Sequence, residues 1–293
     1  MVMTIATALP KSPEIKQLDC QRKCGNVSIP YPFGLVGDDP SCYRDEFKLF
    51  CNTATDHRPQ LMMYGPDSDE YGDKIVLNIS LDGELTFSYW AAVECDMGEN
   101  RHYTTYIVTM SIGEKEYYST KIPKAYRFSN SRNKFIAIGC NTRGIMTDYY
   151  HLEELTECVS FCHHDTEVTN IRCDGIGCCQ KVIPEDLDSF RLLFDSYKKE
   201  SLHTAYAWNM SKCRMAFLSD EDWFGSSASN LWNSINNVDY LVNVGFRTPV
   251  VLDWAIRSNT SCDETQGVTN TDHACGNNTN CIHSKNGPGY LCQ

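Results

Sequence analysis

Cysteine usage limits what this chain can fold into more than any other feature of its sequence. The 293 residues include sixteen cysteines, an even number that allows every thiol to pair. Cytosolic proteins keep few thiols, whereas secreted proteins oxidise them into disulfides. Five acceptor sequons for N-linked sugar agree with that compartment, at Asn26, Asn78, Asn209, Asn259 and Asn277. The sequence therefore predicts a secreted, disulfide-rich glycoprotein.

Composition and charge narrow the function classes. Hydrophobic residues make up 42% of the chain, enough for the core of one large or two ordinary domains. The net charge of −12 argues against binding to nucleic acid or to an anionic membrane face, since both would repel the chain. Residues 1–19 carry a short apolar run that we interpret as a signal remnant or leader. No apolar run approaches the roughly 18 residues that a spanning helix needs, so we expect no membrane span in this chain.

Strand patterns dominate the first half of the chain. Residues 74–90, KIVLNISLDGELTFSYW, contain two alternating apolar runs joined by Asp82-Gly83, a pair typical of hairpin turns. The alternation predicts one face formed by Ile75, Leu77, Ile79 and Leu81, and one face of the returning strand formed by Leu85, Phe87 and Tyr89. Residues 125–140 are a second hairpin candidate, with residues 129–133 as the connection, and residues 104–112 supply another β-branched run.

The second half of the chain differs from the first in its cysteine density and polarity. Cysteines crowd into a polar stretch after Cys140, and we place a module boundary there. Pro184, followed by Glu185 and Asp186, predicts the start of a short helix, because acidic side chains favour the positive end of a helix. Residues 249–256, PVVLDWAI, predict a strand with one strongly apolar face, formed by Val250, Leu252, Trp254 and Ile256.

Residues 24–34, CGNVSIPYPFG, form the most unusual short segment. Pro30 and Pro32 fix φ and have no amide hydrogen to donate, so the segment suits a sheet edge or a polyproline-like strap. Cys24 would anchor it through a disulfide. We interpret the segment as a structural clamp.

Several motifs together point to a known family. They are CGNVSIPYPFG, FKLFC at residues 47–51, NKFIAIGC at 133–140, GIGCCQ at 175–180 with VIP after it, and PVVLDWAI. In these motifs, which follow in register from about Cys20 to Cys292, the chain resembles the extracellular part of plant wall-associated receptor kinases. Members of that family continue into a membrane span and a cytoplasmic kinase, so kinase activity does not carry over to these residues.

The strand patterns and the resemblance together predict a mainly β fold with minor α. The resemblance implies a galacturonan-binding-like β module at residues 20–145 and a cysteine-rich module of the wall-associated-kinase C-terminal type at residues 146–261. A partial module like epidermal growth factor follows at residues 262–293, so the chain would stop inside it. By this resemblance Cys262 pairs with Cys281 and Cys275 with Cys292, and the pairing of the other twelve cysteines stays open.

The resemblance also implies a function, the noncatalytic recognition of cell-wall pectin or oligogalacturonides outside the cell. Binding an acidic polymer requires local positive charge, because the whole chain is acidic. Residues 117–143 contain six cations and no acidic residue: Lys121, Lys124, Arg127, Arg132, Lys134 and Arg143. A planar guanidinium can form two parallel hydrogen bonds with a uronate carboxylate. The competing interpretation is a solvated hairpin surface whose cations do not converge, and Arg22 with Lys23 is a second cationic candidate.

Two aromatic side chains in the proline-rich segment have two possible roles. Tyr31 and Phe33 would either stack on sugar faces or pack into a core, and core packing is the commoner outcome. A peptide- or effector-binding module without sugar affinity is the main alternative, and its affinity should barely depend on salt. Catalytic motifs such as G-x-S-x-G, H-E-x-x-H and a phosphate loop are lacking, so we expect no enzyme.

Metal binding is a further alternative, because Cys158, Cys162, His163, His164, Cys173, Cys178 and Cys179 crowd together. Their spacing matches no zinc pattern, and an oxidising compartment favours disulfides. In the terminal module, Asp263 and Glu264 follow Cys262 instead of preceding it as in calcium-binding modules of that type. We therefore expect neither a metal nor a cofactor.

Overall fold

The computed structural model describes residues 19–54, 58–64, 74–96, 102–105, 109–111, 116–121, 124–149, 153–162, 173–194, 211–257, 262, 275 and 279–292. For residues 96, 102–121 and 228–230 within these ranges, only the backbone is described. Strands form most of the regular structure, helices are few, and eight disulfides crosslink the chain. The predicted fold class, mainly β with minor α and rich in disulfides, is confirmed.

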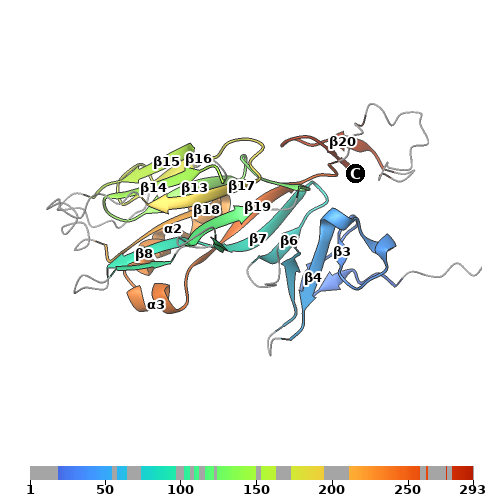
Figure 1. The fold of residues 1–293 in the computed structure, drawn as a ribbon, viewed down its shortest axis with the longest axis horizontal. Coiled ribbons are helices and arrows are strands. Elements are labelled where there is room, and N and C mark those ends of the chain that lie inside the picture. Colours follow the sequence, from blue (N-terminus) through green and yellow to red (C-terminus); the bar gives the residue numbers. More distant parts are fainter. Residues whose placement is uncertain are drawn as a thin grey trace, which may run out of the picture.

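The largest sheet has seven strands in the order β12-β19-β7-β6-β5-β4-β3. Their bounds are β3 (Gly34–Leu35), β4 (Lys48–Asn52), β5 (Gln60–Met63), β6 (Ile75–Ile79), β7 (Glu84–Trp90), β12 (Tyr126–Phe128) and β19 (Arg247–Trp254). Neighbouring strands are antiparallel except β3 and β4, which are parallel. Figure 1 shows the sheet extending from the long strands β7 and β19 to β4 and β3 at one end of the molecule.

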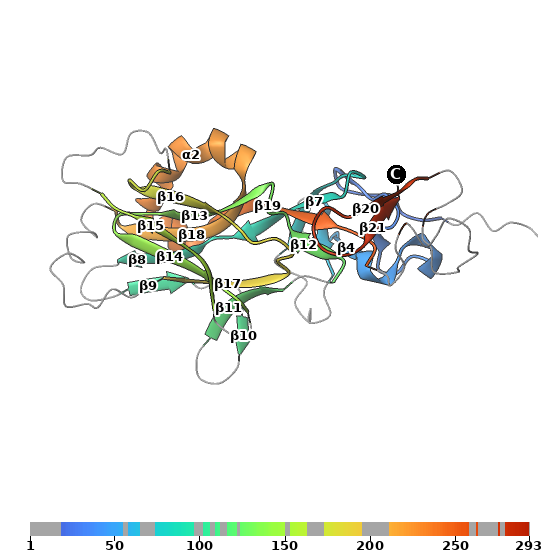
Figure 2. The ribbon, with the colours of Figure 1, turned by 90° about the horizontal axis from the view of Figure 1, so that it is seen from above.

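Two five-stranded sheets lie at the other end of the molecule (Figure 2). The first has the order β16-β13-β18-β8-β9, with β8 (Ala92–Asp96), β9 (His102–Thr105), β13 (Asn133–Ile138), β16 (Cys178–Val182) and β18 (Cys213–Asp220). The second has the order β10-β11-β17-β14-β15, with β10 (Thr109–Ser111), β11 (Glu116–Lys121), β14 (Thr142–Thr147), β15 (Glu154–Ser160) and β17 (Ser189–Phe194). All three large sheets contain strands from both sides of residue 145, so they interleave the two predicted β modules. The module boundaries stay a prediction.

Helices cover the first five-stranded sheet. α2 (Glu221–Ile235) starts directly after β18, where the Asp220 carboxylate accepts a hydrogen bond from the Trp223 backbone N–H. Phe224, Leu231 and Ile235 of α2 pack into the same buried cluster as Phe217 of β18. α3 (Val238–Asn243) follows, and two short 3-10 helices lie near the N-terminus, η1 (Pro40–Cys42) and η2 (Asp45–Phe47). Among the described residues, no helix is both long enough and apolar enough to cross a bilayer.

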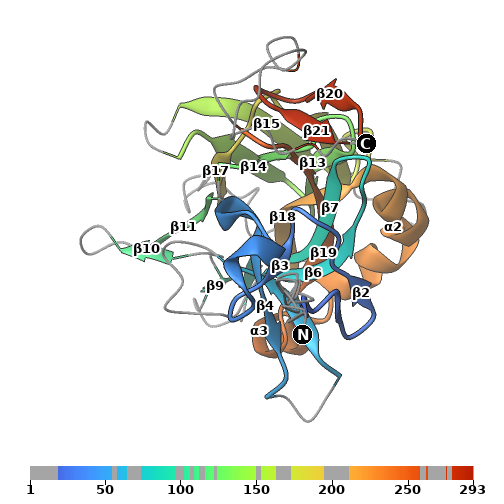
Figure 3. The same ribbon diagram turned by 90° about the vertical axis from the view of Figure 1, so that its right-hand side faces the viewer.

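Two small hairpins complete the fold. β1 (Lys23–Cys24) pairs with β2 (Val27–Ser28), and β20 (Cys281–His283) pairs with β21 (Tyr290–Cys292). The end-on view of Figure 3 shows the β20–β21 hairpin on one side of the seven-stranded sheet and β2 on another. Backbone hydrogen bonds between Ile256 and Tyr290 join the second hairpin to the chain that leaves β19.

The predicted hairpin at residues 74–90 is confirmed. The buried face is as expected on its second strand, β7, but not on its first strand, β6. Leu85, Phe87 and Tyr89 of β7 are buried. Leu77 and Leu81 are about half exposed, and Val76 is buried in their place. The pairing skips Leu77, because Val76 lies opposite Phe87 while Asn78 lies opposite Thr86. This bulge reverses the alternation, which a strict period of two cannot anticipate.

The predicted hairpin at residues 125–140 is wrong. β12 pairs with β19 in the seven-stranded sheet, whereas β13 pairs with β16 and β18 in a different sheet. The chain therefore crosses between sheets at residues 129–133. Asn133 holds this crossing, since its side-chain amide donates to the carbonyls of Ser129 and Val251 and its Oδ1 accepts from the Val251 N–H. The β-branched run at residues 104–112 also divides between β9 and β10, which belong to different sheets.

The expected helix after Pro184 is also wrong. Residues 185–186 form a turn in which Asp186 has φ of 55°, and β17 begins at Ser189. By contrast, the strand predicted at residues 249–256 is confirmed as β19. Val250, Leu252, Trp254 and Ile256 are all buried, as expected from their common face.

Disulfides join all sixteen cysteines. The pairs are Cys20–Cys42, Cys24–Cys51, Cys95–Cys213, Cys140–Cys162, Cys158–Cys179, Cys173–Cys178, Cys262–Cys281 and Cys275–Cys292. The last two are the pairs that the family resemblance implies. The five cysteines of the polar stretch after Cys140 pair with one another or, for Cys162, with Cys140 itself, as expected for an oxidising compartment.

The segment CGNVSIPYPFG runs from the β1–β2 hairpin to the edge strand β3, but after Ser28 only its last residue, Gly34, lies in a strand. Residues 30–33 form a turn in which the Phe33 N–H donates to the Pro30 carbonyl, so the extended edge or strap expected at the prolines is wrong. The Tyr31–Pro32 peptide bond is cis. Phe33 is fully buried and makes edge-to-face contacts with Phe47 and Trp254, with ring centroids 5.1 and 5.2 Å away. Tyr31 is 45% exposed. One aromatic of the pair therefore fixes the segment to the core, and the other faces solvent.

Candidate functional site

An open groove of about 620 Å³ lies between the β1–β2 hairpin and strands β5 and β6. The hairpin contributes Cys24, Asn26 and Val27 to its lining. Residues 58–61 and residues 75–77 contribute the rest. Its volume is within the range of small-ligand sites, which is about 300–1,000 Å³.

Two local features hold the hairpin against the groove. The Cys24–Cys51 disulfide joins β1 to β4. Gly25, in the turn, has φ of +56°, and a Cβ atom there would collide with the backbone oxygen of Pro59. Only glycine fits this approach without strain. The turn is therefore in direct contact with the segment that carries Arg58.

The floor of the groove is apolar. Leu61 and Val76 are almost completely buried beneath it, and both belong to the main hydrophobic core. Val27 is partly buried and packs against that core. Leu77, which the bulge in β6 turns outward, is 48% exposed at the rim. A ligand in the groove would meet a carbon surface that is rigid because it is continuous with the core.

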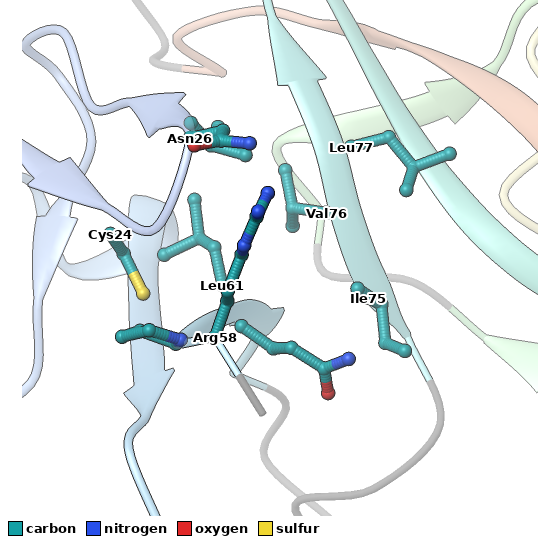
Figure 4. Close-up of a pocket in the computed structure, with 10 residues that line it drawn as sticks. Cys24, Asn26, Arg58, Leu61, Ile75, Val76 and Leu77 are labelled. Carbon is teal, nitrogen blue, oxygen red and sulfur yellow. The ribbon is translucent and has the colours of Figure 1, made fainter. Parts of the chain in front are cut away.

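Polar groups with different chemistry face this apolar floor. Figure 4 shows the Arg58 side chain extending between Leu61 and Val76, in the direction of Asn26. Arg58 is exposed and forms no ion pair or hydrogen bond within the described part of the chain. Gln60 and Asn26 add amide groups that can both donate and accept hydrogen bonds. The groove thus combines one cation, two amides and an apolar surface.

The structure does not gather the six predicted cations of residues 117–143 into one site. Lys121, Arg127, Lys134 and Arg143 lie on β11, β12, β13 and β14, and these strands belong to three sheets. The side chain of Lys121 lies outside the described residues, and Lys124 is exposed. Arg132 lies in the turn before β13.

Carboxylates neutralise the other four cations of this segment. Arg127 Nε lies 2.6 Å from an Asp186 oxygen, and Lys134 Nζ lies 3.1 Å from one of Glu221. Arg143 pairs with Glu157 and Glu154, and Arg132 with Glu84, Asp220 and Asp222. Burial acts to lower the pKa of Arg132, but the hydrogen bond and charge of Asp220, with the charges of Glu84 and Asp222, raise it overall. These acids come from other parts of the sequence, so the local charge count could not reveal them.

The second cationic candidate, Arg22 with Lys23, does not form one site either. Arg22 donates a hydrogen bond from Nη1 to the Phe33 carbonyl, 3.0 Å away, and so helps to fix the proline-rich segment. Lys23 is exposed on β1 and does not line the groove. Sequence reasoning missed Arg58 because a single arginine two residues after Asp56 forms no charge run. Its position within the residues that resemble a galacturonan-binding module is the one signal that could have selected it.

Comparisons with known proteins agree with the sequence motifs. The family model described as "Wall-associated receptor kinase galacturonan-binding" matches residues 20–89. Three similar relatives come from Arabidopsis thaliana. Wall-associated receptor kinase 3 is 28% identical over 98% of this chain, wall-associated receptor kinase 1 is 28% identical over 94%, and wall-associated receptor kinase 2 is 30% identical over 94%. No solved structure matches.

The chain spans about a third of the length of these relatives, 35%, 32% and 32% respectively. The matched third is the extracellular region and not the kinase, and the matching family model is that of a binding domain. The relatives and the disulfides both indicate an extracellular location. This chain is therefore an extracellular region of the wall-associated receptor kinase type, as its motifs predicted.

Proposed function

We propose that this chain binds the galacturonate backbone of pectin and its oligogalacturonide fragments, without catalysis, in the groove beside Arg58. One observation carries the proposal: the galacturonan-binding family model covers residues 20–89, and every residue that lines the groove lies within that range. The groove is thus formed entirely by the segment to which the family model attaches galacturonan binding.

Arg58 supplies the charge that an acidic sugar requires. A guanidinium can form two parallel charge-assisted hydrogen bonds with a carboxylate, which a lysine ammonium cannot reproduce. The cations of residues 117–143 are a second candidate surface, but four of them already hold carboxylates. A uronate would have to displace those carboxylates, whereas at Arg58 no described side chain has to leave.

The rest of the groove suits a sugar ring. A pyranose has a face of C–H groups and a rim of hydroxyls. The exposed carbon surface of Leu77 and the partly buried Val27, which lie over Leu61 and Val76, would pack against the C–H face. The amides of Gln60 and Asn26 would hydrogen-bond the hydroxyls. Because the groove is open to solvent, it could hold one part of a longer polysaccharide without enclosing the whole chain.

We further propose that the chain acts at the cell-wall face of the plasma membrane, as the outer part of a single-pass receptor. The relatives support this placement, since they are named receptor kinases and this chain matches about a third of their length. The bound polymer would then be the signal that the outer part detects.

Titration with defined oligogalacturonides and with uncharged galactose oligomers, at low and high salt, tests the proposal. We expect the charged oligomer to bind more tightly and to weaken as salt rises. Arg58→Ala should weaken binding roughly tenfold or more, since a hydrogen bond to a charged group contributes about 1.5–3 kcal/mol. Arg58→Lys should recover only part of the loss, because it keeps the charge but not the fork.

Lys212→Ala is the matched control, because Lys212 is an exposed cation directly before β18 and does not line the groove. It should bind like the unaltered protein. Equal affinity for charged and neutral oligomers, or equal losses in the Arg58 and Lys212 variants, would contradict the proposal. Salt-independent binding of peptides alone would favour the rival function of a peptide-binding module.

A further inference from the structure

One of the glycosylation sequons forms part of the groove itself. Asn26-Val27-Ser28 begins in the turn of the β1–β2 hairpin, and both Asn26 and Val27 line the groove. Asn26 and Ser28 are exposed. An exposed asparagine in a tight turn is accessible to the enzyme that attaches N-linked sugar. The eight disulfides place the chain on the secretory route, where that enzyme acts.

The position of the turn fixes where a sugar chain would begin. Gly25 lies against the backbone oxygen of Pro59, and Pro59 directly follows Arg58. The disulfide between Cys24 and Cys51 prevents the hairpin from swinging away. Figure 4 shows the Asn26 side chain on the same side of the groove toward which Arg58 points. A glycan attached to Asn26 would therefore start within the wall of the groove that Arg58 also lines.

We propose that an N-linked glycan on Asn26 covers this groove, so that occupancy of the Asn26 sequon regulates access of acidic oligosaccharides to Arg58. The inference rests on the proposed function, because it concerns the same groove. The effect is steric, since an N-glycan core is neutral and leaves the charge of Arg58 unchanged. If the glycan leaves the groove open for a tenth of the time, the apparent affinity falls about tenfold.

Asn78 provides a comparison within the same sheet. It is also exposed and belongs to a sequon, but it lies on β6 after the bulge and does not line the groove. A glycan there would add similar mass without starting from the groove wall. The two sequons therefore separate a specific cover from a general effect of glycosylation.

The experiment uses the full chain secreted from a glycosylating host, with site occupancy measured by mass spectrometry. Ser28→Ala removes the Asn26 sequon but keeps the Asn26 amide, and Asn78→Gln is the matched control. We expect Ser28→Ala to bind oligogalacturonide about tenfold more tightly than the glycosylated protein, and Asn78→Gln to leave binding unchanged. Secreted protein with Asn26 unoccupied, or equal gains in the two variants, would overturn the inference.

A second readout needs no sugar ligand. An arginine-specific dicarbonyl reagent should modify Arg58 faster in Ser28→Ala than in the glycosylated protein, and peptide mapping measures this rate. Equal rates would show that the glycan does not cover Arg58 and would overturn the inference even if oligogalacturonide binds. If Arg58 is shielded but no glycoform binds oligogalacturonide, the proposed function fails while the glycan cover stands.

Discussion

At the scale of single residues, the backbone conformation of Gly25 determines how closely the β1–β2 turn approaches the groove. Its φ of +56° and its contact with Pro59 exclude any Cβ atom. Gly25→Ala should therefore push the hairpin turn off Pro59 and weaken oligogalacturonide binding. It should also destabilise the fold by about 1–2 kcal/mol, the cost of a left-handed conformation for a non-glycine residue.

Gly37 offers the control for this substitution. Its φ is +102°, but no atom lies within 4 Å of the Cβ position and it does not line the groove. Gly37→Ala should lower the midpoint of thermal unfolding while leaving the affinity unchanged. Isothermal titration of both variants separates backbone strain from groove geometry, and an affinity that falls equally in both would refute the role given to the turn.

At the scale of elements, Asn286 ties the β20–β21 hairpin to the rest of the molecule. Its amide nitrogen donates to the Phe128 carbonyl and to Asp253, and its Oδ1 accepts from the Asp186 N–H. Arg257 donates to the carbonyls of Asn286 and Pro288 on the other side of the same loop. Burial lowers the pKa of Arg257 to about 10, with the nearby charge of Arg127 acting in the same direction.

Replacing Asn286 should therefore loosen the hairpin. Asn286→Ala leaves the Phe128 carbonyl and the Asp186 N–H without this partner, at about 1–3 kcal/mol for each group that stays buried and unpaired. The control is Asn243→Ala, because Asn243 is an exposed asparagine on α3 whose amide donates to the Asp239 carbonyl. Guanidinium unfolding with intact disulfides should show a large loss for the first variant and under about 0.5 kcal/mol for the second. Comparable losses would contradict this account of the hairpin.

Strands that bury one regular apolar face were predictable from sequence. β7 and β19 could be predicted because each presents a continuous apolar face to one core. β6 was only half predictable, because the bulge at Leu77 depends on its pairing with β7. The crossing between β12 and β13 was not predictable, since the choice of sheet is made by partners about 50 to 130 residues away, such as Val182 and Trp254.

The candidate site was less predictable than the fold. The family resemblance implied a galacturonan-binding-like module at residues 20–145, which include the groove, but counting cations favoured residues 117–143. A charge count along the sequence omits the carboxylates that folding brings beside those cations, such as Asp186 beside Arg127 and Asp220 beside Arg132. Arg58 is a candidate because the β1–β2 hairpin and the bulged strand β6 form a groove around it. That groove exists only in the tertiary structure.

At the scale of the whole molecule, three interleaved sheets and eight disulfides make the groove a fixed feature of one continuous scaffold. The seven-stranded sheet joins the groove strands β5 and β6 through β7 and β19 to β12. The β20–β21 hairpin contacts the end of this sheet near Ile256. Backbone pairing therefore connects the groove to the terminal hairpin through one continuous sheet.

Amide hydrogen exchange with and without a defined oligogalacturonide tests the central claim most directly, because it locates the bound sugar without any substitution. The structure predicts added protection in residues 24–27, 58–61 and 75–77, and its loss at high salt. Protection confined to residues 117–143, with none around the groove, would contradict the account and move the site to the ion-paired cations.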